Sequence, residues 1–119
     1  FFPTFCELAG LEVPATVEGR SVAPVLRGES TSWREDLMVE TADRRMVRWG
    51  GWKYVCQKTD RGHRECLYSL EEDPYETVEL AWNDAYLPVL EEGRQRLDRL
   101  MAETGGGFET TMRGRVREA

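Results

Sequence analysis

The central stretch of the chain, residues 44 to 70, alternates apolar and polar side chains with the period of two that β-strands produce. Two of its runs flank Gly50 and Gly51, and such glycine pairs favour the twisted turns that join antiparallel strands. With the turn centred there, three pairs face each other: Trp49 with Trp52, Val47 with Tyr54, and Arg45 with Cys56. The pattern therefore predicts a β-hairpin in a defined register.

A second hairpin is predicted around the loop Asp60-Arg61-Gly62. Read as a three-residue connection with glycine in the left-handed position, it fits a type I turn closed by a bulge. That register sets three further pairs opposite each other: Cys56 with Cys66, Tyr54 with Tyr68, and Trp52 with Leu70. Cys56 and Cys66 would then be close enough to form a disulfide under oxidation.

Together the two hairpins predict a sheet with one apolar face. That face would carry Trp49, Val47, Trp52, Tyr54, Cys56, Cys66, Tyr68 and Leu70. The opposite face would carry Arg44, Arg48, Lys53, Gln57, Glu65 and Ser69, with Met46, Val55 and Leu67 among them. Because side chains alternate, a slip of one residue would exchange the two faces of a strand.

Residues 36–41, DLMVET, add a further strand, joined to the next by a turn at Ala42 and Asp43. In this register three pairs form: Val39 with Met46, Met38 with Val47, and Glu40 with Arg45. The prediction is a four-stranded antiparallel meander with strands near 36–41, 44–49, 52–58 and 63–70.

An amphipathic helix is predicted after the sheet. Its apolar positions recur every three or four residues at Tyr86, Leu90, Leu97, Leu100 and Met101, and Gly93 lies on the same side. Pro88 belongs in the first turn, so the helix should begin at 84–87, and the glycines at 105–107 should end it. The expected fold class is α+β: the four-stranded meander packed against this long C-terminal helix, with a short N-terminal helix.

Residues 1–10 supply that short helix, with Pro3 in its first turn and Gly10 as its stop. Residues 21–28 should form one more helical turn, which Ser21 can cap. Phe1, Phe2, Phe5 and Leu8 form an apolar stripe that we expect to act as an association surface. We divide the chain into an N-terminal helix-and-loop segment (1–35), an α+β subdomain (36–104) and a flexible tail (105–119).

Composition limits the partners that this chain can have. Its 119 residues are 32% charged with a net charge of −6, which argues against nucleic acid as the main partner. No apolar run approaches the roughly 20 residues of a membrane span. The chain opens on Phe1-Phe2 without a methionine, so we expect it to be a piece of a longer protein.

Catalytic motifs are missing from the sequence: it has no GxSxG, P-loop, HExxH or GxGxxG. Arg48, Lys53 and His63 are candidates for an anion-binding trio and so for a substrate cleft, although alternation sets His63 at the edge of a loop. The second hairpin could also bring His63 near two of the three cysteines as metal ligands. The competing interpretation of those cysteines is that they are buried free thiols.

Three segments carry a resemblance to a known family: FPTFCELAGLEVPATVEGRSVAPVLRGE, RMVRWGGWKYV and LYSLEEDPYETVELA. In this combination they resemble the C-terminal part of sulfatases of the alkaline-phosphatase superfamily, of the arylsulfatase-like kind. The likeness extends from residue 1 to about residue 104. Ser69 stands where the family usually has aspartate, and Glu79 stands where it usually has asparagine.

The resemblance implies a parent enzyme that hydrolyses sulfate esters with a formylglycine nucleophile and a calcium-type divalent cation. The nucleophile motif of that family is C-x-P-x-R or C-x-A-x-R, and none of Cys6, Cys56 and Cys66 lies in such a context. The chain itself should therefore have no catalytic residue, no metal and no cofactor. In the parent its partner would be the catalytic domain, and alone it should form homo-oligomers.

The resemblance thus implies an inactive C-terminal fragment of a sulfuric ester hydrolase, with a structural, cleft-completing or oligomerising role. An alternative remains open from the residues alone. The chain could be a free-standing interaction or dimerisation module with no enzymatic parent, using the stripe at its N-terminus.

Overall fold

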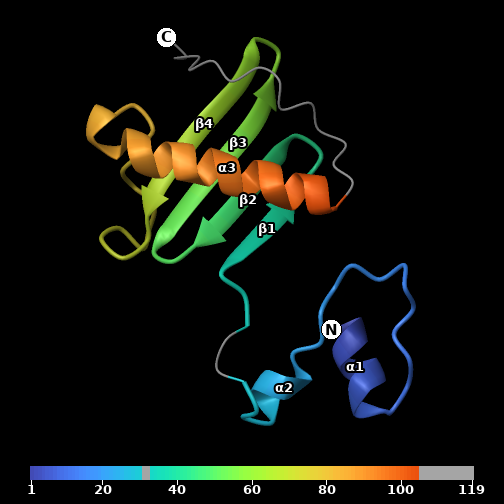
Figure 1. Cartoon of the computed structure of the whole chain (residues 1–119). Helices are drawn as coiled ribbons and strands as arrows, with labels where there is room; N and C mark the ends of the chain where they lie inside the picture. Colours follow the sequence, from blue (N-terminus) through green and yellow to red (C-terminus); the bar gives the residue numbers. More distant parts are fainter. Residues whose placement is uncertain (31–32, 105–119) are drawn as a thin grey trace. The chain divides into compact units, whose positions relative to one another are not determined.

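The structure, a computed structural model, describes residues 1–30 and 33–104 (Figure 1). Its contacts divide the chain into two compact units, one of residues 1–35 and one that begins at Asp36. We describe each unit by itself. The expected flexible tail at 105–119, and the helix stop at 105–107, lie outside the described residues.

The first unit holds two short helices, α1 (Phe2–Leu8) and α2 (Ala23–Leu26). Pro3 lies in the first turn of α1, and Gly10 follows its end with a φ of 69°, a left-handed conformation that glycine adopts without strain. The Thr4 hydroxyl accepts a hydrogen bond from the Val22 amide at 3.0 Å, which links the two helices. The Ser21 hydroxyl accepts one from the Ala23 amide, but the N-cap residue of α2 is Val22, so Ser21 lies one position before the N-cap position that the sequence predicts for it.

The second unit is the predicted meander followed by a helix. Its strands are β1 (Asp36–Glu40), β2 (Arg44–Trp49), β3 (Trp52–Thr59) and β4 (Gly62–Ser69), and they pair in the order of the sequence. The registers predicted for β1 with β2 and for β2 with β3 are confirmed, including Val39 with Met46 and Val47 with Tyr54.

The register predicted for β3 with β4 is wrong by one residue. Thr59 pairs with Gly62, so the turn contains only Asp60 and Arg61. Three observed pairs replace the expected ones: Cys56 with Glu65, Tyr54 with Leu67, and Trp52 with Ser69. The slip exchanges the two faces of β4, as the period of two requires.

The corrected register changes the composition of both faces. We call the side of the sheet that α3 covers the inner face, and the other side the outer face. Glu65, Leu67 and Ser69 belong to the inner face and are buried, contrary to expectation. Cys66 and Tyr68 lie on the outer face instead, and Cys66 pairs with Val55. A disulfide between Cys56 and Cys66 is therefore excluded in this fold, because their side chains leave opposite sides of the sheet.

The helix that covers the inner face is α3 (Leu87–Glu103), which follows the 3₁₀ turn η1 (Asp84–Tyr86), and Figure 1 shows it crossing the sheet. The shared core contains Val47, Trp49, Tyr54, Cys56, Leu67, Ala81, Leu90, Leu97 and Met101. Gly93 permits the close approach of helix and sheet, because a Cβ placed there would lie 2.8 Å from the Tyr54 Cβ. The α+β fold class is thus confirmed.

The carboxylates of Glu79 and Asp73 hold the segment that follows β4 in place. Glu79, which stands where the resemblance leads us to expect asparagine, accepts hydrogen bonds from the amides of Leu67 at 3.0 Å and Ala81 at 2.5 Å. Asp73 accepts one from the Val78 amide at 2.7 Å, as expected for an aspartate that starts a turn. The substitution at Glu79 therefore retains an acceptor, and it fixes this segment to the edge of β4.

Candidate functional site

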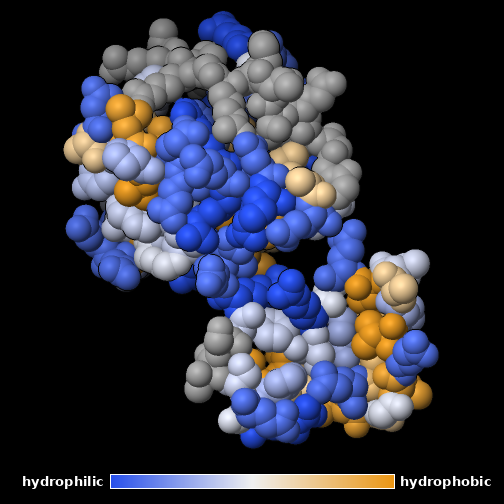
Figure 2. Space-filling model, viewed as in Figure 1, coloured by the Kyte–Doolittle hydropathy of each residue, from blue (hydrophilic) through white to orange (hydrophobic). Residues whose placement is uncertain are grey.

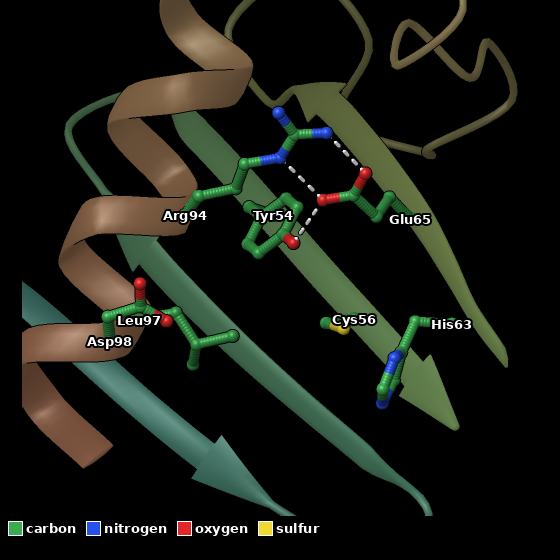
Figure 3. Close-up of a pocket in the computed structure, with 7 residues that line it drawn as sticks. All are labelled: Tyr54, Cys56, His63, Glu65, Arg94, Leu97 and Asp98. Carbon is green, nitrogen blue, oxygen red and sulfur yellow. Dashed lines mark hydrogen bonds and ion pairs between the residues drawn. The ribbon is translucent and has the colours of Figure 1, made fainter. Parts of the chain in front are cut away.

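A small pocket lies between α3 and the two last strands of the sheet (Figure 3). The helix contributes three lining residues, β3 two and β4 two: Arg94, Leu97, Asp98, Tyr54, Cys56, His63 and Glu65. It has room for roughly one water molecule, far less than a sugar would need. The polar side chains of the pocket can therefore contact one another and water, but the pocket is too small to admit a sugar.

Glu65 is the centre of the polar side of this pocket. Its carboxylate accepts hydrogen bonds from the Tyr54 hydroxyl at 2.6 Å and from Arg94 Nε and Nη2 at 2.7 and 2.5 Å (Figure 3). The side chain of Glu65 is 3% exposed, so its charge is buried and needs this pairing. We call Tyr54, Glu65 and Arg94 the Glu65 network.

Two members of the network, Tyr54 and Arg94, have pKa values above their usual ones. Burial raises the pKa of Tyr54 above its usual value, and the neighbouring negative charge of Glu65 raises it further. The hydrogen bonds from Arg94 to Glu65 raise the pKa of the Arg94 guanidinium. At neutral pH, Tyr54 therefore donates, Arg94 is charged, and the carboxylate is occupied by three donors. A carboxylate that accepts three hydrogen bonds is suited to holding the helix on the sheet and not to acting as a general acid or base.

The candidate cleft residues do not gather at one place. Arg48 and Lys53 are cross-strand neighbours on the outer face, as alternation predicted. Lys53 forms an ion pair with Glu76 at 2.6 Å, and its ammonium group lies 5.9 Å from the Tyr68 ring centroid. His63 is buried on the inner face, in the pocket described above. The structure thus brings two of the three together and separates the third, and a role in a substrate cleft stays a prediction.

The three cysteines do not form the centre of a metal site in the part of the chain that the structure describes. None of them forms a disulfide; Cys6 is buried in the first unit, and the side chains of Cys56 and Cys66 leave opposite faces of the sheet. Within residues 1–30 and 33–104, no group of three or more His, Cys, Asp or Glu side chains could hold a metal ion. The residues present therefore do not fit the calcium-type cation or the formylglycine that the sulfatase resemblance implies, and no chemical step is derived through either. In the same described ranges, no helix is long and apolar enough to cross a membrane.

The N-terminal stripe is exposed, as predicted. The exposed fractions of its side chains are 94% for Phe1, 54% for Phe2, 64% for Phe5 and 57% for Leu8. The rings of Phe1 and Phe5 stack with their centroids 6.3 Å apart. Figure 2 shows apolar residues gathered on the surface of this unit. The other side of α1, with Pro3, Thr4 and Cys6, is buried within the unit.

The Glu65 network does not follow from the sequence pattern. Arg94 was overlooked because charged residues of an amphipathic helix are normally solvated, although it directly follows Gly93 on the side facing the sheet. Glu65 was assigned to the outer face by the wrong register of β4. The two-residue reading of the loop at Asp60 and Arg61 would have placed Glu65 inside, where a buried cation is the expected partner.

A family model and a curated relative both identify the same family for this chain. A family model described as N-sulphoglucosamine sulphohydrolase, C-terminal, matches residues 1–103. The Delta 4,5-hexuronate-2-O-sulfatase of Bacteroides thetaiotaomicron is 38% identical over an alignment of 105 residues that covers 81% of this chain and 21% of that protein.

Solved structures show the same fold. The structure of a 2-O GAG sulfatase matches with a TM-score of 0.75 at 34% identity, covering 88% of this chain and 24% of that one. A phosphonate monoester hydrolase of Agrobacterium radiobacter matches with a TM-score of 0.68 at 24% identity, covering 86% of this chain and 24% of that one. This last likeness shows the fold alone, so the fold by itself does not distinguish sulfatases from related hydrolases.

The chain spans about a fifth of the length of the curated sulfatase that it resembles, and about a quarter of the solved chains. The match extends over nearly all the described residues, both units included. The sequence resemblance to sulfatases is confirmed by these findings, and the chain belongs to the family of N-sulphoglucosamine sulphohydrolase C-terminal domains.

Proposed function

We propose that this chain serves as the C-terminal subdomain of a sulfuric ester hydrolase, in which it supports the catalytic part and completes the substrate cleft. The observation that carries the proposal is the family match over residues 1–103, together with 38% identity to a sulfatase of which the chain spans 21%. The named substrate of that relative, a 2-O-sulfated Delta 4,5-hexuronate, makes sulfated uronic acids the first class to test for the parent enzyme.

The chemistry of the chain supports a role without catalysis. None of its cysteines lies in a C-x-P-x-R or C-x-A-x-R context. In the pocket under α3, the carboxylate of Glu65 is occupied by hydrogen bonds from Tyr54 and Arg94. The parent would supply the nucleophile and the calcium-type cation from its catalytic part. Arg48 and Lys53 are neighbouring cations on the outer face with the charge to contact an anionic substrate, and we keep them as candidates for one wall of the cleft.

A second role concerns association. The exposed stripe of Phe1, Phe2, Phe5 and Leu8 would pack against the catalytic part in the parent. In the isolated chain the same stripe would bring two copies together, most simply as a two-fold dimer in which residues 1–30 contact or exchange with the partner copy. This stripe is also the feature that favours the alternative function, a free-standing interaction module.

An activity assay tests the first proposal. The purified chain should not hydrolyse an aryl sulfate or a 2-O-sulfated hexuronate, with or without calcium, while the Bacteroides sulfatase assayed in parallel should. Turnover by the purified chain that is abolished by Cys56→Ser or His63→Gln would overturn the proposal.

The reading frame around the gene distinguishes the two functions. A long frame upstream of Phe1 that contains C-x-P-x-R or C-x-A-x-R would support the enzyme subdomain. A start codon immediately before Phe1, with no catalytic part in the same frame, would favour the interaction module instead.

A further inference from the structure

The two edges of the sheet differ in how their backbone groups are satisfied. At the β4 edge the following segment supplies partners: the Leu80 amide donates to the Leu67 carbonyl at 2.9 Å, and the Glu79 carboxylate accepts from the Leu67 amide at 3.0 Å. The other edge is β1, and within the described residues of the second unit no strand pairs with its open side (Figure 1). Amides and carbonyls along such an edge form a template for one more strand.

The turn between β1 and β2 determines which backbone groups of β1 face that open side. The Thr41 amide donates to the Arg44 carbonyl at 2.9 Å, so these residues form a hydrogen-bonded pair. Hydrogen-bonded and non-hydrogen-bonded pairs alternate along an antiparallel ladder, so the backbone groups of Leu37 and Val39 face β2. The amides and carbonyls of the other three residues of β1 therefore point toward the open edge.

The side chains of β1 lack the features that usually keep an edge strand from pairing. The strand contains no proline and no lysine, and its pairing with β2 is continuous, without a bulge. Leu37 and Val39 lie on the outer face and are 44% and 45% exposed. A partner strand would therefore find both open backbone groups and apolar side chains at this edge.

The two carboxylates of β1 are already neutralised within the chain. Both belong to the inner face, where Asp36 pairs with Arg96 at 3.1 Å and also with Arg99, and Glu40 pairs with Arg45. Charged side chains on an edge strand normally repel a second strand. Because these two carboxylates have arginine partners, they oppose a further pairing less than unpaired carboxylates would.

We infer that β1 is an edge through which two copies of this chain pair, antiparallel and with Met38 on the two-fold axis. In this register Leu37 of one copy lies opposite Val39 of the partner copy, and the symmetry repeats this contact. These are the non-hydrogen-bonded pairs, in which facing side chains approach most closely. The inference concerns a different unit from the stripe on α1, and it does not rest on the proposed function.

A second copy matches the requirements of this edge. A two-fold axis at Met38 gives the register in which all three outward-facing residues of β1 have backbone partners, while the exposed side chains of Leu37 and Val39 meet apolar ones. The carboxylates that then face each other, Asp36 and Glu40 of the partner copy, keep their arginines. A five-residue edge buries little surface, so the stripe on α1 should set the association constant of the isolated chain, and the edge pairing is best trapped covalently.

Disulfide trapping tests this register. Cys66→Ser removes the partly exposed thiol, and Leu37→Cys and Val39→Cys are then made as two separate proteins in that background. Mild oxidation of their mixture should give at least tenfold more disulfide-linked dimer than oxidation of either protein alone. The reason is distance: the two positions face each other, whereas like positions are diagonal neighbours about 7–8 Å apart, too far for an unstrained disulfide.

The matched control replaces one partner. Val78→Cys, at an exposed apolar position of the same unit, mixed with Leu37→Cys reports disulfides formed by random collision. A yield in the Leu37→Cys and Val39→Cys mixture that is no higher than in this control would overturn the inference. So would a yield as high with either protein alone, because that result requires another register. Circular dichroism of each variant should match the parent chain, since both substituted side chains are nearly half exposed.

Hydrogen exchange of the trapped dimer gives an independent measurement. If the two strands form a ladder, the Met38 amide, which points to the open edge, should exchange at least tenfold more slowly in the disulfide-linked dimer than after reduction and dilution. The Val39 amide already faces β2, so its rate should change much less and is the internal control. A Met38 amide that exchanges equally fast in both states would show that only side chains meet, and would overturn the pairing of the edges.

Discussion

Glu65 and Arg94 are 29 residues apart in the sequence and are joined by two hydrogen bonds, from Nε to Oε1 at 2.7 Å and from Nη2 to Oε2 at 2.5 Å. The pair connects α3 to β4, the strand whose register the sequence pattern did not predict. A two-pronged pairing of guanidinium and carboxylate is geometrically demanding, so it fixes both the position of the helix and the face that β4 presents.

Removing the cation should destabilise the fold strongly. Arg94→Met leaves the buried carboxylate of Glu65 without its cation, and breaking a buried pair on one side costs about 3–5 kcal/mol. Adding Glu65→Gln should recover part of the loss, because the amide is uncharged and its oxygen still accepts from Tyr54. Urea unfolding of the single and double variants measures both effects.

The matched control for this prediction is Arg27→Met. Arg27 forms ion pairs with Glu7 and Glu29, but it is exposed, and exposed pairs contribute little to stability. If Arg94→Met were no more harmful than Arg27→Met, the Glu65 network would not be what holds α3 to the sheet.

Most of the fold could be predicted from the sequence, and particular residues show why. Gly50 and Gly51 mark a tight turn, and the alternation on either side leaves one register for β2 with β3. On β4 the local pattern favoured the wrong register, since it offered Cys66, Tyr68 and Leu70 to the core in place of His63, Glu65 and Ser69. Distant groups stabilise the observed register: Arg94 on α3 pairs with Glu65, and the carboxylate of Glu79 accepts from the Leu67 amide. Local hydrophobic patterns contain no information about such partners.

The same limit applies to the candidate site. Sequence alone correctly placed Arg48 beside Lys53, because cross-strand neighbours follow from the turn. It did not separate them from His63, whose position depends on the length of the loop at Asp60 and Arg61. The exposed stripe on α1 was predictable from its spacing, since the first unit buries only the other side of that helix.

The register of β4 can be tested by oxidation. With Cys56 on the inner face and Cys66 on the outer face, mild oxidation of the folded chain should give no disulfide between them. The same oxidation in urea should give that bridge, which is the internal control for reactivity. Peptide mapping without reduction would detect the bridge between Cys56 and Cys66. A bridge found in the folded chain would show that β3 and β4 pair in the register predicted from the sequence.

A substitution at Gly93 tests the contact between α3 and the sheet. A Cβ at this position would lie 2.8 Å from the Tyr54 Cβ and 2.9 Å from the Trp49 Cη2. Gly93→Ala should therefore destabilise the chain by about 1–3 kcal/mol through overpacking, in spite of the roughly 1 kcal/mol that alanine gains in helix propensity. Gln95→Ala, at an exposed position of the same helix, should leave the free energy of unfolding nearly unchanged. A stabilised Gly93→Ala variant would show that the helix lies farther from the sheet.

Stability should fall in strong alkali because of the tyrosines. Burial is the main cause that raises the pKa of Tyr68 to about 12 from its usual value of 10.0, and nearby Cys66 adds to it. The folded state then binds the Tyr68 proton more tightly than the unfolded state does. The stabilisation is complete below pH 10.0 and is lost as the pH rises through about 12. Tyr68→Phe should make the melting temperature less dependent on pH across this interval than in the parent chain. An unchanged pH dependence would indicate that Tyr68 is solvated.

The stripe on α1 leads to the last prediction, which concerns association of the isolated chain. Phe1, Phe2, Phe5 and Leu8 are each more than half exposed, and burying such a side chain fully contributes roughly 1.5–3 kcal/mol. Two copies that cover each other's stripes recover part of that free energy, so sedimentation equilibrium should show a dimer that forms with rising concentration.

Changing Phe1, Phe2 and Phe5 together to serine should shift the chain to monomer, because the stripe loses its three rings. Val78→Ser removes a comparably exposed apolar side chain from the second unit, at 55% exposure, and should leave the association constant unchanged. A triple variant that associates as tightly as the parent chain would place the contact elsewhere. Protection of Cys66 from maleimide labelling in that variant at high concentration would then identify the outer face of the sheet as the site of pairing, because Cys66 lies on that face.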